Sequence, residues 1–180
     1  MAHYFPKTGV KLVPDMVFML DRHRYAQKHH KNEYDVVLLL RTDKERTLRS
    51  NSSVICQAMM KQGLSCRSHT WMNPLVAHCP KYKTIRQYLH CTASQAFGVL
   101  SKGRIVVTDR LHGALVSYLG NRGVVYIESV SNKTIGVFKT AFSGREDLCI
   151  HSDNSIVQSS HELGEIVTKT LNVFNHMYRT

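Results

Sequence analysis

Residues 104–119, RIVVTDRLHGALVSYL, contain the two patterns that indicate the fold of this chain. The run 104–108 is apolar and rich in β-branched residues, which is typical of a buried strand. Over 111–119 the apolar residues recur every three or four positions, as they do on one face of an amphipathic helix. Only Asp109 and Arg110 separate the two patterns, so the strand leads directly into the helix. Such a pair is the repeating unit of α/β proteins.

The same alternation continues along most of the chain. Apolar runs predict strands at 35–41, 64–70, 104–108, 123–128 and 148–151. Helical spacing of apolar residues predicts helices at 47–62, 83–100 and 111–119, and a closing helix that starts at the capping box Ser159-x-x-Glu162. We therefore expect an α/β fold, a Rossmann-like parallel sheet with helices on both faces.

The amino-acid composition favours some classes of function and argues against others. The chain has 180 residues, of which 43% are hydrophobic and 21% charged, so neither wholesale disorder nor a membrane span is expected. Lys and Arg total 24 against 13 Asp and Glu, which gives a formal net charge of +11. This excess favours an anionic ligand: a phosphorylated metabolite, an acidic glycan, nucleic acid or an anionic membrane surface. The scarcity of carboxylates argues against glycosidase chemistry.

The cysteines and the sequons point to different compartments. The 5 cysteines are widely spaced and form no C-x-x-C pair, which predicts free thiols and no disulfide framework. No cysteine or histidine pair has zinc-finger spacing, so no metal site is predicted. Free thiols favour the cytosol, and residues 9–20 do not resemble a signal peptide. The sequons Asn51-Ser52-Ser53 and Asn132-Lys133-Thr134 would instead suit a secretory lumen such as the Golgi.

Candidate site residues follow the predicted strands. In open α/β sheets, ligands bind beyond the carboxyl ends of the strands, where Arg41, Arg110, His112 and Lys133 would converge. The first-turn N–H groups of the helix 111–119 suit a phosphate or carboxylate. Gly113 would leave backbone room for a ligand, and Asp109 is the expected N-cap. The alternative is a surface pair of Asp109 and Arg110, with His112 serving only in packing.

One segment resembles a known family. The block Val107-Thr108-Asp109-Arg110-Leu111-His112-Gly113-Ala114-Leu115, followed by Gly123-Val124-Val125-Tyr126 and by Ser131-Asn132-Lys133, is similar to the polysaccharide pyruvyl transferases. Val13-Pro14-Asp15 and Leu38-Leu39-Leu40-Arg41 also resemble segments of that family. The resemblance covers roughly residues 10–140, and the Arg-Leu-His-Gly block with its downstream strand is its most specific part.

The resemblance implies a GT-B-like protein whose C-terminal domain binds phosphoenolpyruvate and transfers pyruvate, as a ketal, to a glycan acceptor. Residues 35–180 would be that domain, residues 21–34 a basic linker, and residues 1–20 a remnant of an N-terminal domain that is largely missing from this chain. An exposed face on that remnant, with Val17, Phe18 and Leu20, would favour self-association.

The residues have expected roles in this scheme. Arg110 and Arg41 would clamp the anion, and His112 would donate a proton or contact the phosphate. Lys133 would be a weaker phosphate contact, and Leu111 and Gly113 would line the substrate-binding site. The scheme needs no metal or other cofactor.

Two other functions stay open. One is a GT-B glycosyltransferase domain that binds a nucleotide sugar. The other is a non-catalytic basic module that binds an acidic anion or glycan. Nucleic-acid binding by the basic run 22–31 is not expected, because such a run is more often a solvated connector.

Overall fold

A computed structural model describes residues 17, 32–42, 51–69, 84–127, 149–152 and 160–177. The elements in these ranges are β1 (Tyr34–Leu39), α2 (Ser52–Lys61), β2 (Cys66–Ser68), α4 (Ile85–Leu100), β3 (Gly103–Thr108), α5 (Leu111–Leu119), β4 (Gly123–Ile127), β5 (Cys149–Ser152) and α7 (Ser160–Met177). No helix within the described ranges combines the length and the apolar character needed to cross a membrane.

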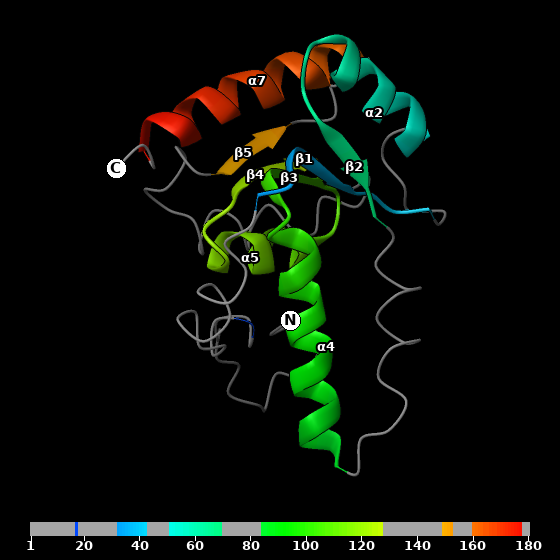
Figure 1. The fold of residues 1–180 in the computed structure, drawn as a ribbon, viewed down its shortest axis with the longest axis vertical. Helices are drawn as coiled ribbons and strands as arrows, with labels where there is room; N and C mark the ends of the chain where they lie inside the picture. The colour runs from blue at the N-terminus through cyan, green and yellow to red at the C-terminus, as the bar shows by residue number, and fades with distance from the viewer. Residues whose placement is uncertain are drawn as a thin grey trace, which may run out of the picture.

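The strands form one parallel sheet in the order β2-β1-β3-β4-β5 (Figure 1). β1 and β3 are neighbours in the middle of the sheet, with Val36 opposite Ile105 and Leu39 opposite Thr108. After β1 the chain moves outward to β2, and it then crosses back to β3 on the other side of β1. The direction of winding therefore reverses between β1 and β3.

Two hydrophobic layers cover the sheet, because alternate side chains of a strand point to opposite faces. On one face Val37, Leu39 and Val106 pack with the buried residues of α4 and α5. On the other face Val36, Leu38 and the neighbouring strand residues pack with α2 and α7. Figure 1 shows α2 and α7 on one side of the sheet and α4 and α5 on the other. The predicted parallel α/β fold with helices on both faces is confirmed.

Several element boundaries differ from those predicted. The helix predicted at 47–62 begins only at Ser52, because Asn51 is extended (φ −67°, ψ 143°) and accepts a hydrogen bond from the Ser53 N–H. The predicted stop is confirmed: the helix ends before Gly63, whose φ of +81° suits glycine. The strand predicted at 64–70 is short and lies at the sheet edge. Ser159, the predicted cap of α7, lies outside the described residues.

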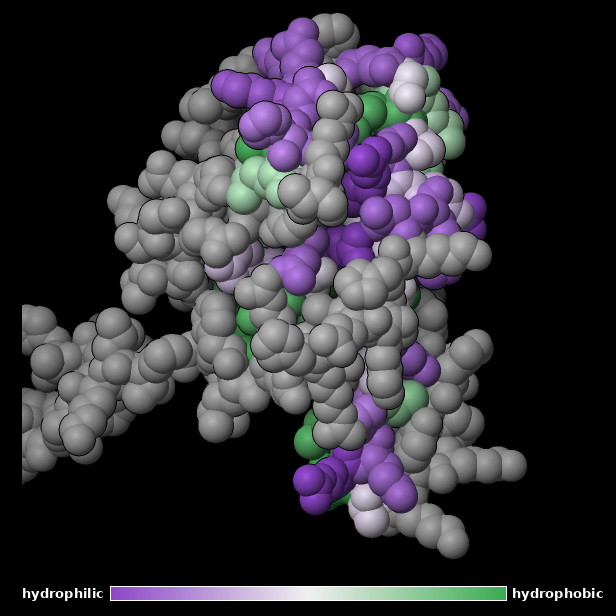
Figure 2. Space-filling view, turned by 60° about the vertical axis from the view of Figure 1, so that its left-hand side comes forward, coloured by the Kyte–Doolittle hydropathy of each residue, from purple (hydrophilic) through white to green (hydrophobic). Residues whose placement is uncertain are grey.

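Helix α4 is packed at only one of its ends. Ala96, Phe97 and Leu100 are buried against the sheet, whereas Ile85 and Leu89 near the start of the helix are 78% and 59% exposed. Figure 1 shows α4 extending away from the sheet, and Figure 2 shows polar and apolar residues side by side at that end of the molecule. The apolar spacing that predicted this helix therefore does not mark a buried face along its whole length.

Val17 lies in the core. It is 9% exposed and belongs to the cluster formed with α4, α5 and one face of the sheet. The expected exposed N-terminal patch is therefore wrong at Val17, since burial against the sheet leaves this side chain unable to contact a partner. Phe18, Leu20 and the basic run 22–31 lie outside the described residues.

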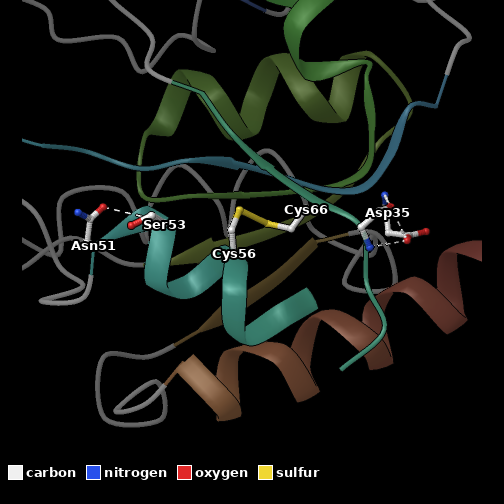
Figure 3. The surroundings of a disulfide bond; sticks show 6 residues. Asp35, Asn51, Ser53, Cys56 and Cys66 are labelled. Atoms are coloured by element: carbon white, nitrogen blue, oxygen red, sulfur yellow. Dashed lines mark hydrogen bonds between the residues drawn. A yellow bond between two sulfur atoms is a disulfide. The ribbon is translucent and has the colours of Figure 1, made fainter. Parts of the chain in front are cut away.

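A disulfide joins Cys56 of α2 to Cys66 of β2, with a Cα–Cα distance of 5.3 Å (Figure 3). Both residues are buried between the helix and the sheet edge. The expectation of free thiols is therefore wrong for this pair. The two cysteines are ten positions apart in the sequence, and the tight packing of α2 against β2 brings them within bonding range. Cys91 in α4 forms no disulfide with another described residue.

Replacing both Cys56 and Cys66 by serine should lower the free energy of unfolding by about 2–4 kcal/mol, because the disulfide restricts the unfolded chain. Urea denaturation checks this value. A reducing agent serves as the matched control: it should lower the midpoint of the wild type and leave that of the double variant unchanged. Equal midpoints for the oxidised wild type and the variant would contradict a stabilising bond.

Candidate functional site

The strand order 2-1-3-4-5 defines where a ligand is expected. In doubly wound sheets of this order, ligands bind beyond the carboxyl ends of the strands at the point where the winding reverses, which is between strands 1 and 3. In this chain, that point lies between Leu39, the last residue of β1, and Thr108, the last residue of β3. Arg41 and Arg110 each lie two positions after the last residue of their strand.

A hydrogen-bond network ties the two strand ends together. The Thr108 hydroxyl donates to the Leu39 carbonyl over 2.7 Å and accepts from the Arg110 N–H over 3.1 Å. The Asp109 Oδ1 accepts from the Arg41 N–H over 2.8 Å. The backbone of Arg41 is therefore held directly beside Asp109, and Arg41 and Arg110 lie at the same edge of the sheet, as predicted.

Asp109 is not the N-cap of α5. The N-cap is Arg110, which is extended (φ −107°, ψ 121°) and makes no side-chain capping bond. The Asp109 side chain instead bonds to the segment after β1. The prediction of Asp109 as the cap was wrong. A carboxylate just before a helix can accept a hydrogen bond either from the first-turn N–H groups of that helix or from a neighbouring segment. Here the Arg41 N–H, after β1, is the donor. The surface-pair alternative fails too, since Asp109 is only 2% exposed.

The Asp109 carboxyl is only partly satisfied. Its Oδ2 is buried and has no hydrogen-bond partner among the described residues. Burial raises the pKa of Asp109 above its usual value, although the Arg41 N–H, the residue's own N–H and the charges of Arg110 and Arg41 act to lower it. Protonation at Oδ2 would remove the cost of burying a charge and would create a donor that has no acceptor among the described residues.

Asp109 should make stability decline with rising pH. The folded state binds the proton more tightly than the unfolded state, so the free energy of unfolding falls as pH increases from about 4, the usual carboxyl pKa, through the raised folded value. Asp109→Asn keeps the oxygen that accepts from Arg41 and should remove this fall. Asp109→Ala should cost about 1–3 kcal/mol at pH 4, because it leaves the Arg41 N–H without its acceptor, and the cost should shrink as the pH rises, because the wild type loses the contribution of the protonated carboxyl. Urea midpoints measured between pH 4 and pH 8 test both.

Asp35 provides the control of opposite sign. Burial acts to raise its pKa, but hydrogen bonds from Ser65 and the Arg104 charge lower it overall. Its contribution is therefore present above pH 4 and lost as the pH falls. Asp35→Asn should cost more stability at pH 7 than at acidic pH. The same pH trend for both variants would argue against the assigned environment of Asp109.

The Arg110 side chain also has an unsatisfied donor. It is partly buried, and its Nε has no hydrogen-bond partner within the described part of the chain. The first-turn N–H groups of a helix lack intrahelical acceptors, and the side chain at the N-cap of α5 supplies none. A guanidinium donor and the positive end of a nine-residue helix thus occur together, which is an arrangement suited to an anion.

The three predicted site residues after Arg110, at positions 111–113, differ in how exposed they are. His112 is exposed in the first turn of α5, whereas Leu111 is half-buried and packs on the core. Gly113 is buried, and a Cβ there would lie 2.9 Å from Leu39 Cδ2 and from Thr108 Oγ1. The protein itself therefore occupies the space that glycine was expected to leave for a ligand, and Gly113 allows α5 to pack closely on the strand ends. Lys133 lies outside the described residues.

Two functional candidates were missed as site residues in the sequence. The sequence pattern indicates Asp109 as a helix cap and Thr108 only as the last residue of a strand. The signal available was a carboxylate placed directly after a fully apolar run, since a buried strand rarely ends in an acid without a partner. The partner could not be identified, because Arg41 is 68 residues away in sequence.

Other parts of the described structure offer weaker sites. A cavity of about 460 Å³ is lined by one face of α4, at Arg86, Gln87, His90, Cys91 and Ser94, and does not include the strand ends. Within the described ranges, no three His, Cys, Asp or Glu side chains gather as metal ligands.

Comparisons of the chain with protein-family models, with curated proteins and with solved structures found no match. What the site can do therefore follows from its own chemistry.

Proposed function

We propose that this chain forms the donor-binding domain of a pyruvyl transferase-like enzyme of GT-B type, which takes pyruvate from phosphoenolpyruvate. The observation that carries the proposal is the link between Asp109 and the Arg41 N–H at the point where the sheet reverses its winding. This link holds the Arg41 backbone against Asp109, the residue that precedes Arg110 at the start of α5, where no side chain caps the helix. The similarity of the Arg-Leu-His-Gly segment to pyruvyl transferases supports the same function.

Phosphoenolpyruvate suits this site because it carries a carboxylate and a phosphate on adjacent atoms. A guanidinium binds either group through two parallel hydrogen bonds, so two arginines can engage both ends of one small ligand. The N–H groups at the start of α5 provide further donors for the phosphate. A net charge of +11 also attracts a multiply charged anion to the chain.

The proposed reaction converts a sugar diol and phosphoenolpyruvate into a pyruvate ketal and inorganic phosphate. A proton adds to the enol methylene, and one sugar hydroxyl bonds to the resulting cationic carbon. The C–O bond to phosphate breaks, and phosphate leaves with the electron pair. The second hydroxyl then bonds to the same carbon, and the two hydroxyl protons are released. In total, the two hydroxyl protons that are released balance the proton added to the methylene and the proton taken up by the leaving phosphate, so the chemistry needs acid and base groups but no redox cofactor.

His112 and Asp109 are the protein groups that would handle these protons. His112 is exposed at the first turn of α5, where a ligand bound by the helix N–H groups would contact it. Asp109 has a raised pKa, and its Oδ2 has no hydrogen-bond partner within the described ranges. In its neutral form it would add a donor without repelling the anion. We assign the proton donor to His112, and Asp109 acts as the positioning residue for Arg41.

A nucleotide sugar is the second candidate donor. The reversal point of a doubly wound sheet, with a helix N-terminus beside it, also suits a diphosphate. The two ligands differ in that phosphoenolpyruvate has a carboxylate and no base or ribose.

Isothermal titration distinguishes these readings when the full chain is titrated with phosphoenolpyruvate, with UDP-galactose and with inorganic phosphate. We expect heat from phosphoenolpyruvate, weaker binding of phosphate and none of UDP-galactose. Tight binding of UDP-galactose without a response to phosphoenolpyruvate would establish the glycosyltransferase alternative. Equal, steeply salt-dependent binding of all three anions would indicate a basic module with no specific donor site.

A further inference from the structure

We propose that Asn51 carries an N-linked glycan, added in the oxidising lumen in which the Cys56–Cys66 disulfide also forms. Asn51 begins the sequon Asn51-Ser52-Ser53, and both Asn51 and Ser53 are exposed. The disulfide attaches α2, the helix that begins within this sequon at Ser52, to β2 (Figure 3). The proposal concerns a modification of the chain and does not depend on the function of the site at β1 and β3.

The two atoms of the Asn51 amide have separate tasks. Its Oδ1 accepts a hydrogen bond of 3.2 Å from the Ser53 N–H and so caps α2. Its Nδ2 points away from the helix in Figure 3 and makes no hydrogen bond to a described residue. A glycan is attached through the nitrogen and leaves the carbonyl oxygen in place. The capping bond and the modification are therefore compatible.

The covalent step requires an oligosaccharide that is activated as a polyprenyl diphosphate. The Asn51 Nδ2 loses one proton and bonds to the anomeric carbon of the first sugar. The bond between that carbon and the diphosphate oxygen breaks, and the polyprenyl diphosphate leaves with the electron pair. The linkage at Asn51 stays an amide, so its oxygen can still accept from the Ser53 N–H.

The disulfide is an independent indication of the same compartment. Disulfides form and persist in the secretory pathway and outside the cell, and are rare in the cytosol, where thiols are kept reduced. An Asn-x-Ser/Thr tripeptide arises easily by chance, and it is modified only where the glycosylation machinery operates. The Asn51 sequon is exposed, and Asn51 lies five positions before a disulfide cysteine. The disulfide thus indicates that the chain passes through the compartment in which an exposed sequon is modified. The second sequon, at Asn132, lies outside the described residues.

The test is expression of the full chain behind a cleavable secretory leader in a eukaryotic cell. An Asn132→Gln background removes the second sequon. Gel mobility of the total cellular product is compared before and after peptide-N-glycosidase, and mass spectrometry reads the conversion of Asn51 to Asp by that enzyme. We expect one glycan-sized shift that depends on Asn51. Reading total product makes the result independent of whether a variant is secreted.

Matched variants separate glycosylation from helix capping. Ser53→Ala destroys the sequon but keeps the backbone N–H that the Asn51 oxygen caps, so it should lose the glycan while α2 remains capped. Ser53→Thr should retain the glycan, and so should Ser52→Ala, which leaves both ends of the sequon intact. Asn172→Gln alters an exposed asparagine outside any sequon and should change nothing. The proposal is overturned if the wild-type sequon shows no shift, or if Ser53→Ala keeps it.

Discussion

Replacing His112 by alanine is expected to reduce turnover by roughly 10²–10⁴, the range associated with the loss of a general acid or base. Binding of phosphoenolpyruvate should weaken much less, because Arg41, Arg110 and the start of α5 remain. His112 is exposed, so its removal leaves the core unchanged. The measurement is phosphate release from phosphoenolpyruvate in the presence of a galactose-containing acceptor, alongside titration of the full chain with the donor.

His112→Gln distinguishes proton transfer from hydrogen bonding. Glutamine can still donate a hydrogen bond to the phosphate, but its amide does not take up and release a proton near neutral pH. Turnover by His112→Gln should therefore be about as slow as turnover by His112→Ala. If glutamine restores turnover, His112 acts as a phosphate contact and the proton comes from another group. Asp109 is then the next candidate, since its carboxyl is buried and its Oδ2 has no partner in the part of the chain that the structure describes.

Arg110→Ala should weaken phosphoenolpyruvate binding more than tenfold. The loss of a charged hydrogen-bond partner at a bound anion costs on the order of 1.5–3 kcal/mol, and 1.4 kcal/mol corresponds to a factor of ten. Thermal stability should change little, because the Arg110 Nε is buried without a partner in the described structure and the capping of α5 uses no side-chain bond. Isothermal titration gives the affinity, and thermal melts check the fold.

Two further variants control for charge. Arg110→Lys retains the charge but cannot make the two parallel bonds of a guanidinium, so it should recover only part of the affinity. Lys61→Ala removes an exposed cation at the end of α2, away from the ends of β1 and β3, and should leave the affinity near that of the wild type. Equal losses at Lys61 and Arg110 would mean that the net charge alone attracts the ligand.

The disulfide and the sequon change the interpretation of the compartment. Counting cysteines favoured the cytosol, but α2 and β2 bring Cys56 and Cys66 together. Cysteine spacing along the sequence does not reveal pairing, because a disulfide depends on the distance between Cα atoms and on the direction of the side chains. The proposed glycan at Asn51 would agree with the compartment that the disulfide indicates.

The order of the elements was accessible from local patterns. Apolar runs and helical spacing are properties of neighbouring residues, so the strands at β1, β3 and β4 and the helix α5 were predicted close to their observed bounds. The start of α2 was predicted too early, at residue 47 instead of Ser52. Asn51 caps the helix, but the sequence pattern also allows it to lie inside a helix, so the pattern did not reveal the boundary. The exposure of Ile85 and Leu89 was not predictable, since spacing alone does not say whether another element covers the helix.

Sequence alone thus determined the parallel α/β architecture and the presence of Arg41, Arg110 and His112 after strands or at a helix start. Tertiary structure decided which groups meet. Asp109 became a buried partner of the Arg41 N–H only because β1 and β3 are adjacent and in register, which joins residues 68 positions apart. The same pairing placed Leu39 and Thr108 against Gly113. The physical reason is that strand order and register arise from packing over the whole sheet, whereas strand and helix patterns are encoded locally.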